Sequence, residues 1–142
     1  MLGTAIMMIA DLVSVTAQPQ WIWNNSPLIA ARWLGDHGLT HGVGEYWSAN
    51  LIAAMSGNRL EIGSVVPRDG KVVPYVLATD RNRFAKAPQF VVWRDENLTG
   101  LKFTDVQATY TIKRLTSVAG YRIAVLVDPE GDRTYAKVTA SH

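Results

Sequence analysis

Residues 38–66 read GLTHGVGEYWSANLIAAMSGNRLEIGSVV, and this stretch decides the fold that we expect. Its first part, residues 40–46, is short and rich in glycine and predicts a strand. Residues 47–55 place apolar side chains at helical spacing, and residues 60–66 return to a strand-like pattern rich in β-branched side chains. The expected order is therefore strand, helix, strand.

The expected helix has apolar residues on one face and recognisable ends. Leu51, Ile52 and Met55 share that face, Ser48 is the expected N-cap, and Gly57 follows the last apolar residue, where helices commonly end. A helix of about three turns between two strands usually forms a right-handed crossover. The two strands should therefore be parallel neighbours in one sheet.

Polar and aromatic side chains gather at the turn between the first strand and this helix. Glu45, Tyr46 and Trp47 fall at the carboxyl end of the strand, where open α/β sheets usually bind ligands, and Asn50 lies one helical turn after Tyr46. Such a set can stack on a sugar ring and hydrogen-bond its hydroxyl groups. The alternative is a pair of core aromatic residues beside a helix cap. These four residues are the candidate ligand-binding site, and we assign none of them a catalytic role.

The composition narrows the class of protein. At 142 residues the chain has the length of one domain. Hydrophobic residues make up 48% and charged residues 18%, below the roughly 25% charged residues of typical soluble domains. The surface is therefore expected to be either unusually apolar or partly covered, as by a membrane or a larger protein. The net charge is +2 and the basic residues are scattered, which argues against nucleic-acid binding. The absence of cysteine excludes disulfides and thiolate chemistry.

The first 25 residues differ from the rest and divide the chain in our interpretation. Residues 1–17, MLGTAIMMIADLVSVTA, carry one charge and are short for a complete membrane span. They are interpreted as the remnant of a membrane helix, a secretory signal, or a helix packed on the domain. Residues 18–25 contain Trp21 and Trp23 and predict a linker. We therefore expect an apolar segment and linker over 1–25 and one α/β domain over 26–142.

The remainder of the chain predicts further helices and strands. Ser26 and Pro27 are the expected N-cap and first residue of a helix that ends at Gly38. The turn at Asp69 and Gly70 predicts an antiparallel hairpin between the flanking segments. The expected strands are residues 60–66, 72–77, 89–93, 108–115 and 121–127, and the tail at 134–138 either adds an edge strand or frays. Residues 79–88 predict a loop over the sheet edge, and residues 95–105 predict an irregular connection.

The expected fold class is thus α/β. It comprises a mixed sheet of about five strands with an N-terminal βαβ unit, an antiparallel C-terminal hairpin and two or three helices.

Histidines next to the candidate site raise a metal and an enzyme hypothesis. His37 and His41 have the spacing of two zinc ligands on a helix, but Gly38 breaks that helix, and no third histidine lies near. We therefore expect no metal and no cofactor. The alternative to a binding domain is a small soluble enzyme in which Glu45 acts as acid or base beside His41. A purely structural interaction domain is the third hypothesis.

The order of these features resembles a known family. Residues 37–67, HGLTHGVGEYWSANLIAAMSGNRLEIGSVVP, followed by VPYV, FVVW, TYTIKRL and YRIAVLV, resemble the C-terminal extramembrane domain of bacterial polytopic glycosyltransferase-like membrane proteins. These belong to the class related to dolichyl-phosphate-mannose protein mannosyltransferases. Tyr46 and Trp47 occupy the positions that look like those of the family, with Glu45 and Asn50 as neighbours.

The resemblance implies a function without catalysis. In such enzymes the reactive carboxylates lie in loops between many membrane helices, and this chain is expected to have at most one short span. The expectation is a non-catalytic accessory or binding domain on the periplasmic face of a membrane, either truncated or detached from a longer protein. Its implied ligand is a sugar, a polyprenyl-phosphate sugar or an acceptor, and its implied partner a membrane or a membrane protein. The alternative is that the protein is soluble and cytoplasmic.

Overall fold

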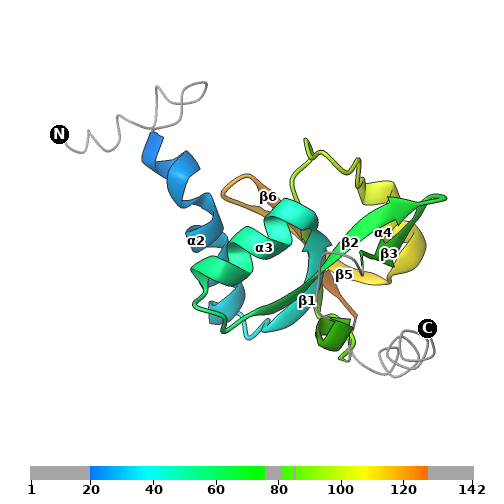
Figure 1. The fold of residues 1–142 in the computed structure, drawn as a ribbon, viewed down its shortest axis with the longest axis horizontal. Helices are drawn as coiled ribbons and strands as arrows, with labels where there is room; N and C mark the ends of the chain where they lie inside the picture. The colour runs from blue at the N-terminus through cyan, green and yellow to red at the C-terminus, as the bar shows by residue number, and fades with distance from the viewer. Residues whose placement is uncertain (1–19, 76–80, 85, 128–142) are drawn as a thin grey trace.

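The structure is a computed structural model that describes residues 20–75, 81–84 and 86–127. The apolar segment at 1–17 and the expected edge strand at 134–138 lie outside these residues. The described chain forms an α/β fold around one mixed sheet (Figure 1). The expected fold class is confirmed, with six strands in place of about five.

The six strands lie in the order β3-β2-β1-β4-β6-β5. β1 is parallel to both of its neighbours, β2 and β4, and the remaining pairs are antiparallel. The strands are β1 (His41–Glu45), β2 (Glu61–Arg68), β3 (Lys71–Pro74), β4 (Phe90–Trp93), β5 (Ile112–Val118) and β6 (Tyr121–Leu126). A parallel core of three strands is thus extended by antiparallel strands on both sides.

The central strand–helix–strand unit has the expected form. β1 leads directly into helix α3 (Tyr46–Met55), and the chain returns as β2 beside and parallel to β1. The helix ends in a turn where Asn58 and Gly57 both have positive φ, which stops the helical hydrogen-bond pattern. The predicted parallel crossover is therefore confirmed.

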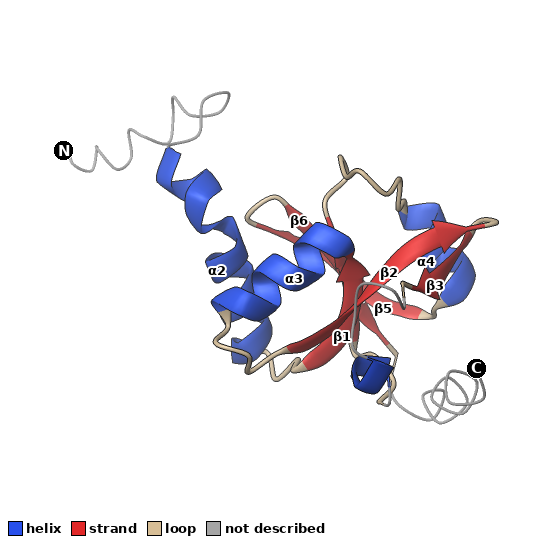
Figure 2. Ribbon diagram, viewed as in Figure 1, coloured by secondary structure: helices blue, strands red, loops and turns tan. Residues whose placement is uncertain are grey.

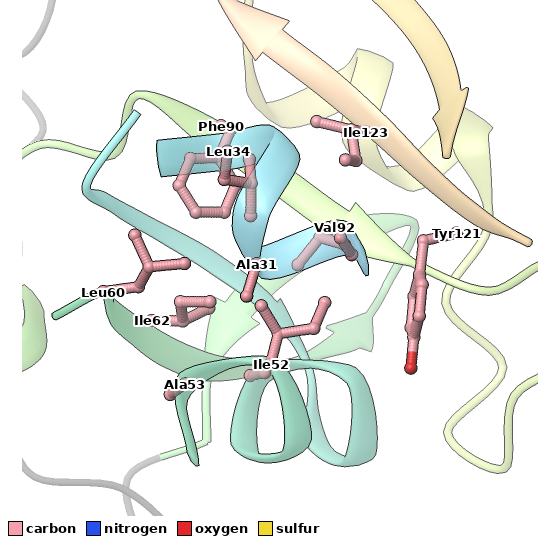
Figure 3. Close-up of a cluster of buried hydrophobic side chains, with 12 residues drawn as sticks. Ala31, Leu34, Ile52, Ala53, Leu60, Ile62, Phe90, Val92, Tyr121 and Ile123 are labelled. Carbon is pink, nitrogen blue, oxygen red and sulfur yellow. The ribbon is translucent and has the colours of Figure 1, made fainter. Parts of the chain in front are cut away.

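Helices cover both faces of the sheet (Figure 2). Two clusters of buried apolar side chains form beneath them. On one face α2 (Gln20–Asp36) and α3 pack together, and Figure 3 shows Leu34, Ile52, Ile62 and Phe90 in the resulting cluster. On the other face α4 (Phe103–Thr109) contributes Val106 to the second cluster. The sheet is therefore buried between two apolar layers, as expected for strands in an α/β fold.

The first helix begins earlier than predicted. α2 starts at Gln20 and contains Pro27 in its interior, so the expected N-cap at Ser26 is wrong, and residues 20–25 are helical and not an irregular linker. Proline lacks an N–H and so omits one helical hydrogen bond, but Ser26 and Pro27 are both buried against the domain. Tertiary packing therefore maintains a helix across a residue that usually begins one.

The expected strand over residues 108–115 is also misplaced. Residues 103–109 form α4, whose first turn is closed by the Asp105 carboxylate accepting the Lys102 backbone N–H at 2.9 Å. The strand follows as β5, and its hairpin with β6 turns at Ala119 and Gly120, both with positive φ. The hairpin itself is confirmed, but its first strand begins and ends later in the sequence.

The second predicted hairpin and the predicted buried strand are present in the described residues. β2 and β3 form the predicted antiparallel hairpin around Asp69 and Gly70, and β4 is the predicted buried strand. Within the expected loop, the short 3-10 helix η2 (Arg81–Phe84) lies on β2, where Arg83 Nη1 donates to the Ile62 carbonyl at 3.0 Å. This segment therefore covers part of the second face.

Candidate functional site

Glu45 lies at the junction of β1 and α3 and is only 2% exposed. Its carboxylate accepts the Trp47 N–H at 3.2 Å, the Ser48 N–H at 2.9 Å and the Ser48 hydroxyl at 2.7 Å. Glu45 is therefore the N-cap of α3, and the prediction that Ser48 has this role is wrong. A carboxylate at a helix N-terminus also interacts favourably with the helix dipole.

Tyr46 and Trp47 form the first turn of α3 and contact one another. Their rings meet edge to face with centroids 5.0 Å apart, and Tyr46 meets Tyr75 in the same manner at 6.1 Å. Trp47 remains 51% exposed, whereas Tyr46 is half-buried. The indole is thus supported on one side by an aromatic neighbour and open to solvent on the other.

Asn50 has a structural role. Its Nδ2 donates to the Tyr46 carbonyl at 2.8 Å and to the Ser64 hydroxyl at 3.3 Å. These bonds join the first turn of α3 to β2. Of the four predicted ligand-binding residues, neither Asn50 nor Tyr46 lines the pocket described next.

The site lies where the sheet connections diverge. The chain that leaves β1 crosses one face through α3 and returns on the β2 side, whereas the chain that leaves β4 crosses the other face through α4 and returns on the opposite side. Because β1 and β4 are parallel neighbours, their carboxyl ends flank a topological switch point. Ligands of open α/β sheets usually bind at such points.

A shallow pocket of about 350 Å³ opens at this switch point. It is lined by residues that follow the two strands: Glu45, Trp47, Arg94, Glu96, Asn97 and Leu98. The structure thus brings Glu45 and Trp47 together with a second group, residues 94–98, that the sequence interpretation missed. The signal for this second group was its position directly after the apolar strand FVVW, but its use required knowing that this strand lies beside β1.

The second wall of the pocket is held by an asparagine. Asn97 Nδ2 donates to the carbonyls of Arg94 at 2.7 Å and Leu101 at 2.9 Å. Its Oδ1 accepts the Thr99 hydroxyl at 2.7 Å and the Leu101 N–H at 3.0 Å. All the hydrogen-bonding capacity of one amide is therefore used to fix the loop that follows β4.

Arg94 extends from this loop towards the first residue of β6. Its guanidinium carbon lies 5.1 Å from the centre of the Tyr121 ring. Burial raises the pKa of Tyr121, a hydrogen bond and the charge of Arg94 oppose that rise, and the charge of Glu45 adds to it. Glu45 and Arg94 both line the switch-point pocket.

The histidines do not join the site. His41 is the first residue of β1 and Glu45 the last, so about four residue steps of roughly 3.3 Å separate them along an extended strand. The structure therefore does not bring Glu45 and His41 to one point, as the enzyme hypothesis requires. His37 stacks on Trp33 at 3.9 Å, and its Nδ1 lies 2.8 Å from the Trp33 carbonyl oxygen. Across residues 20–75, 81–84 and 86–127, no cluster of three metal-ligating side chains occurs.

Two further findings concern membrane-spanning helices and similarity to known proteins. Among the described residues, no helix combines the length and the apolar character needed to cross a bilayer. Comparisons with protein-family models, curated proteins and solved structures found no match to this chain.

Proposed function

We propose that this domain is a non-catalytic carbohydrate-binding domain whose ligand occupies the switch-point pocket. The observation that carries the proposal is the half-exposed indole of Trp47, which lines the pocket beside the Glu45 carboxylate and the Arg94 guanidinium. An open aromatic face can stack on the apolar face of a sugar ring, while charged groups beside it hydrogen-bond the hydroxyl groups.

The proposal includes the origin suggested by the sequence. We propose that the domain derives from glycosyltransferase-like membrane proteins, because Tyr46 and Trp47 stand at the strand–helix junction that the resemblance identifies. In this proposal the domain works at the extracytoplasmic face of a membrane and takes a sugar, a lipid-linked sugar or a glycosylation acceptor. The carboxylate of Glu45 caps a helix, which supports a role in binding and not in acid–base chemistry.

The test compares two variants on the same helix. Trp47→Ala should abolish saturable binding of methyl glycosides or short oligosaccharides, measured by calorimetry, because it removes the stacking surface. Leu51→Ala is the matched control, since Leu51 is also exposed on α3, one turn later, but does not line the pocket. Both variants should unfold at nearly the wild-type urea concentration. The proposal fails if the wild type binds no glycoside, or if Trp47→Ala binds as the wild type and the Leu51→Ala control do.

A second candidate, an interaction domain, is supported by a separate observation. Leu51, Ile52 and Met55 were expected to share one apolar face of the helix, but only Ile52 is buried, and the other two are 42% and 47% exposed. With Trp47 they form an apolar stripe along α3, and Leu98 is 88% exposed on the neighbouring loop. Exposed apolar patches often mark membrane or protein contacts. Co-sedimentation with lipid vesicles that is lost in a Leu51→Ser/Met55→Ser variant would favour this candidate.

A further inference from the structure

The charges that line the switch-point pocket restrict the ligand further. Two carboxylates, Glu45 and Glu96, and one guanidinium, Arg94, belong to the lining. The pocket residues therefore carry a net negative charge. The neighbouring Asp95 does not add to this negative charge, because its carboxylate pairs with Arg122 at 3.1 Å.

The backbone N–H groups that usually bind anions at a strand–helix junction already have a hydrogen-bond acceptor in this chain. Free N–H groups at a helix N-terminus commonly bind phosphate. In α3, however, the N–H groups of Trp47 and Ser48 both donate to the Glu45 carboxylate. A phosphate that bound these N–H groups would have to displace the buried Glu45 carboxylate. A phosphate that bound beside the carboxylate would be repelled by its charge.

Hydroxyl groups suit the same atoms better. The Oε2 atom of Glu45 accepts one bond, from Trp47, and a carboxylate oxygen can accept two. Glu96 adds acceptors at the exposed rim, and Arg94 supplies donors. A neutral ring with several hydroxyl groups can donate to the carboxylates and accept from the guanidinium while it stacks on Trp47.

We infer that the ligand is recognised through an uncharged, polyhydroxylated sugar ring, and that a phosphate on that ring opposes binding. This inference rests on the proposed carbohydrate-binding function and names its substrate class. The same recognition serves a free saccharide or the distal sugar of a larger glycoconjugate. In either case, charged groups of the ligand must lie outside the pocket.

The experiment measures the affinity of the full chain for matched probes by calorimetry. The probes are the methyl glycosides of glucose, galactose, mannose and N-acetylglucosamine, and the corresponding sugar 1-phosphates. The sugar that binds should bind about threefold or more tightly as the glycoside than as the phosphate, the effect expected of one like charge at a partly exposed site. The difference should shrink in about 0.5 M salt, where the Debye length is only a few ångströms.

Two variants then assign the discrimination to the pocket. Glu96→Gln should reduce the difference between glycoside and phosphate, because it removes the exposed carboxylate from the lining. Glu61→Gln is the control, since Glu61 lies at the opposite, amino-terminal end of β2 and pairs only weakly with Lys86 at 3.7 Å. Its discrimination should match that of the wild type.

The outcomes separate the two claims. Equal or tighter binding of the phosphate overturns the inference but leaves the carbohydrate-binding function standing. A discrimination that Glu96→Gln does not alter also overturns the assignment to this pocket. If neither class of probe binds, the proposed function and the inference fail together.

Discussion

Removal of the Glu45 carboxylate should be among the most destabilising polar substitutions in the described chain. The carboxylate accepts three hydrogen bonds, two from Ser48 and one from Trp47, in a buried position. Hydrogen bonds to charged groups contribute about 1.5–3 kcal/mol each, and loss of an N-cap costs about 0.5–2 kcal/mol. Because these terms overlap, we expect Glu45→Ala to lower the free energy of unfolding by about 3 kcal/mol.

A milder variant and a control make this prediction specific. Glu45→Gln keeps one acceptor oxygen for Ser48 but presents an NH₂ group to the Trp47 N–H, so a loss of about 1–2 kcal/mol is expected. Glu61→Ala should change stability by less than about 0.5 kcal/mol, because its contact with Lys86 is exposed. Urea unfolding followed by far-UV circular dichroism measures all three. The reasoning is refuted if Glu45→Ala costs no more than Glu61→Ala with unchanged denaturant slope.

Three further predictions concern the packing and electrostatics around the site. Gly44→Ala should destabilise the domain by about 2 kcal/mol or more in thermal unfolding, because the new Cβ would lie 2.6 Å from the Val92 carbonyl oxygen. Gly35→Ala is the control: this position on α2 is in open space, so the change should stabilise the domain by up to about 1 kcal/mol. Similar effects at both positions would contradict this packing. Asn97→Ala should raise the hydrogen-exchange rates of residues 98–101 and weaken glycoside binding, and unchanged exchange would refute its role in holding the loop. Burial raises the pKa of Tyr121 above its ordinary value of 10.0, so its contribution to stability is full below that value and is lost as pH rises through the raised folded pKa. Urea unfolding between about pH 9 and 12 should therefore show a loss of stability that Tyr121→Phe removes. The prediction is contradicted if a titration of absorbance at 295 nm shows that Tyr121 ionises at or below the ordinary pKa of tyrosine.

Local sequence signals were sufficient for the central unit of the fold. The spacing of Ile52 relative to its neighbours, the glycine at 57 and the β-branched run at 62–66 each specify backbone geometry within a few residues. The predicted strand–helix–strand order therefore holds. The exposure of Leu51 and Met55 did not follow from these signals, because helical spacing alone does not say which side of an apolar helix the sheet will cover.

Elements that depend on tertiary packing were misread. Pro27 looks like a helix start, but burial of the neighbouring turns maintains α2 through it. The seven residues of α4 are too few to establish a helical period, so residues 103–105 were read as part of an irregular connection and residues 108–109 as the start of a strand.

The sequence predicted one wall of the candidate site and missed the other. Glu45 and Trp47 could be placed because strand and helix are adjacent in the sequence. Arg94 and the loop held by Asn97 could not, because the pairing of β4 with β1 joins segments almost fifty residues apart and leaves no local pattern. The identity of the N-cap also required coordinates, since Glu45 and Ser48 bond one another and either could cap the helix.

The most direct test of a sugar site at the switch point is a ¹H–¹⁵N correlation spectrum of the isotopically labelled chain, titrated with a methyl glycoside that binds in calorimetry. The account predicts that the indole N–H of Trp47 and the backbone N–H groups of residues 94–98 shift together and saturate with one dissociation constant. Shifts confined to the hollow on the other face, lined by Phe103, Gln107 and Tyr110, or no shifts at Trp47, would contradict it.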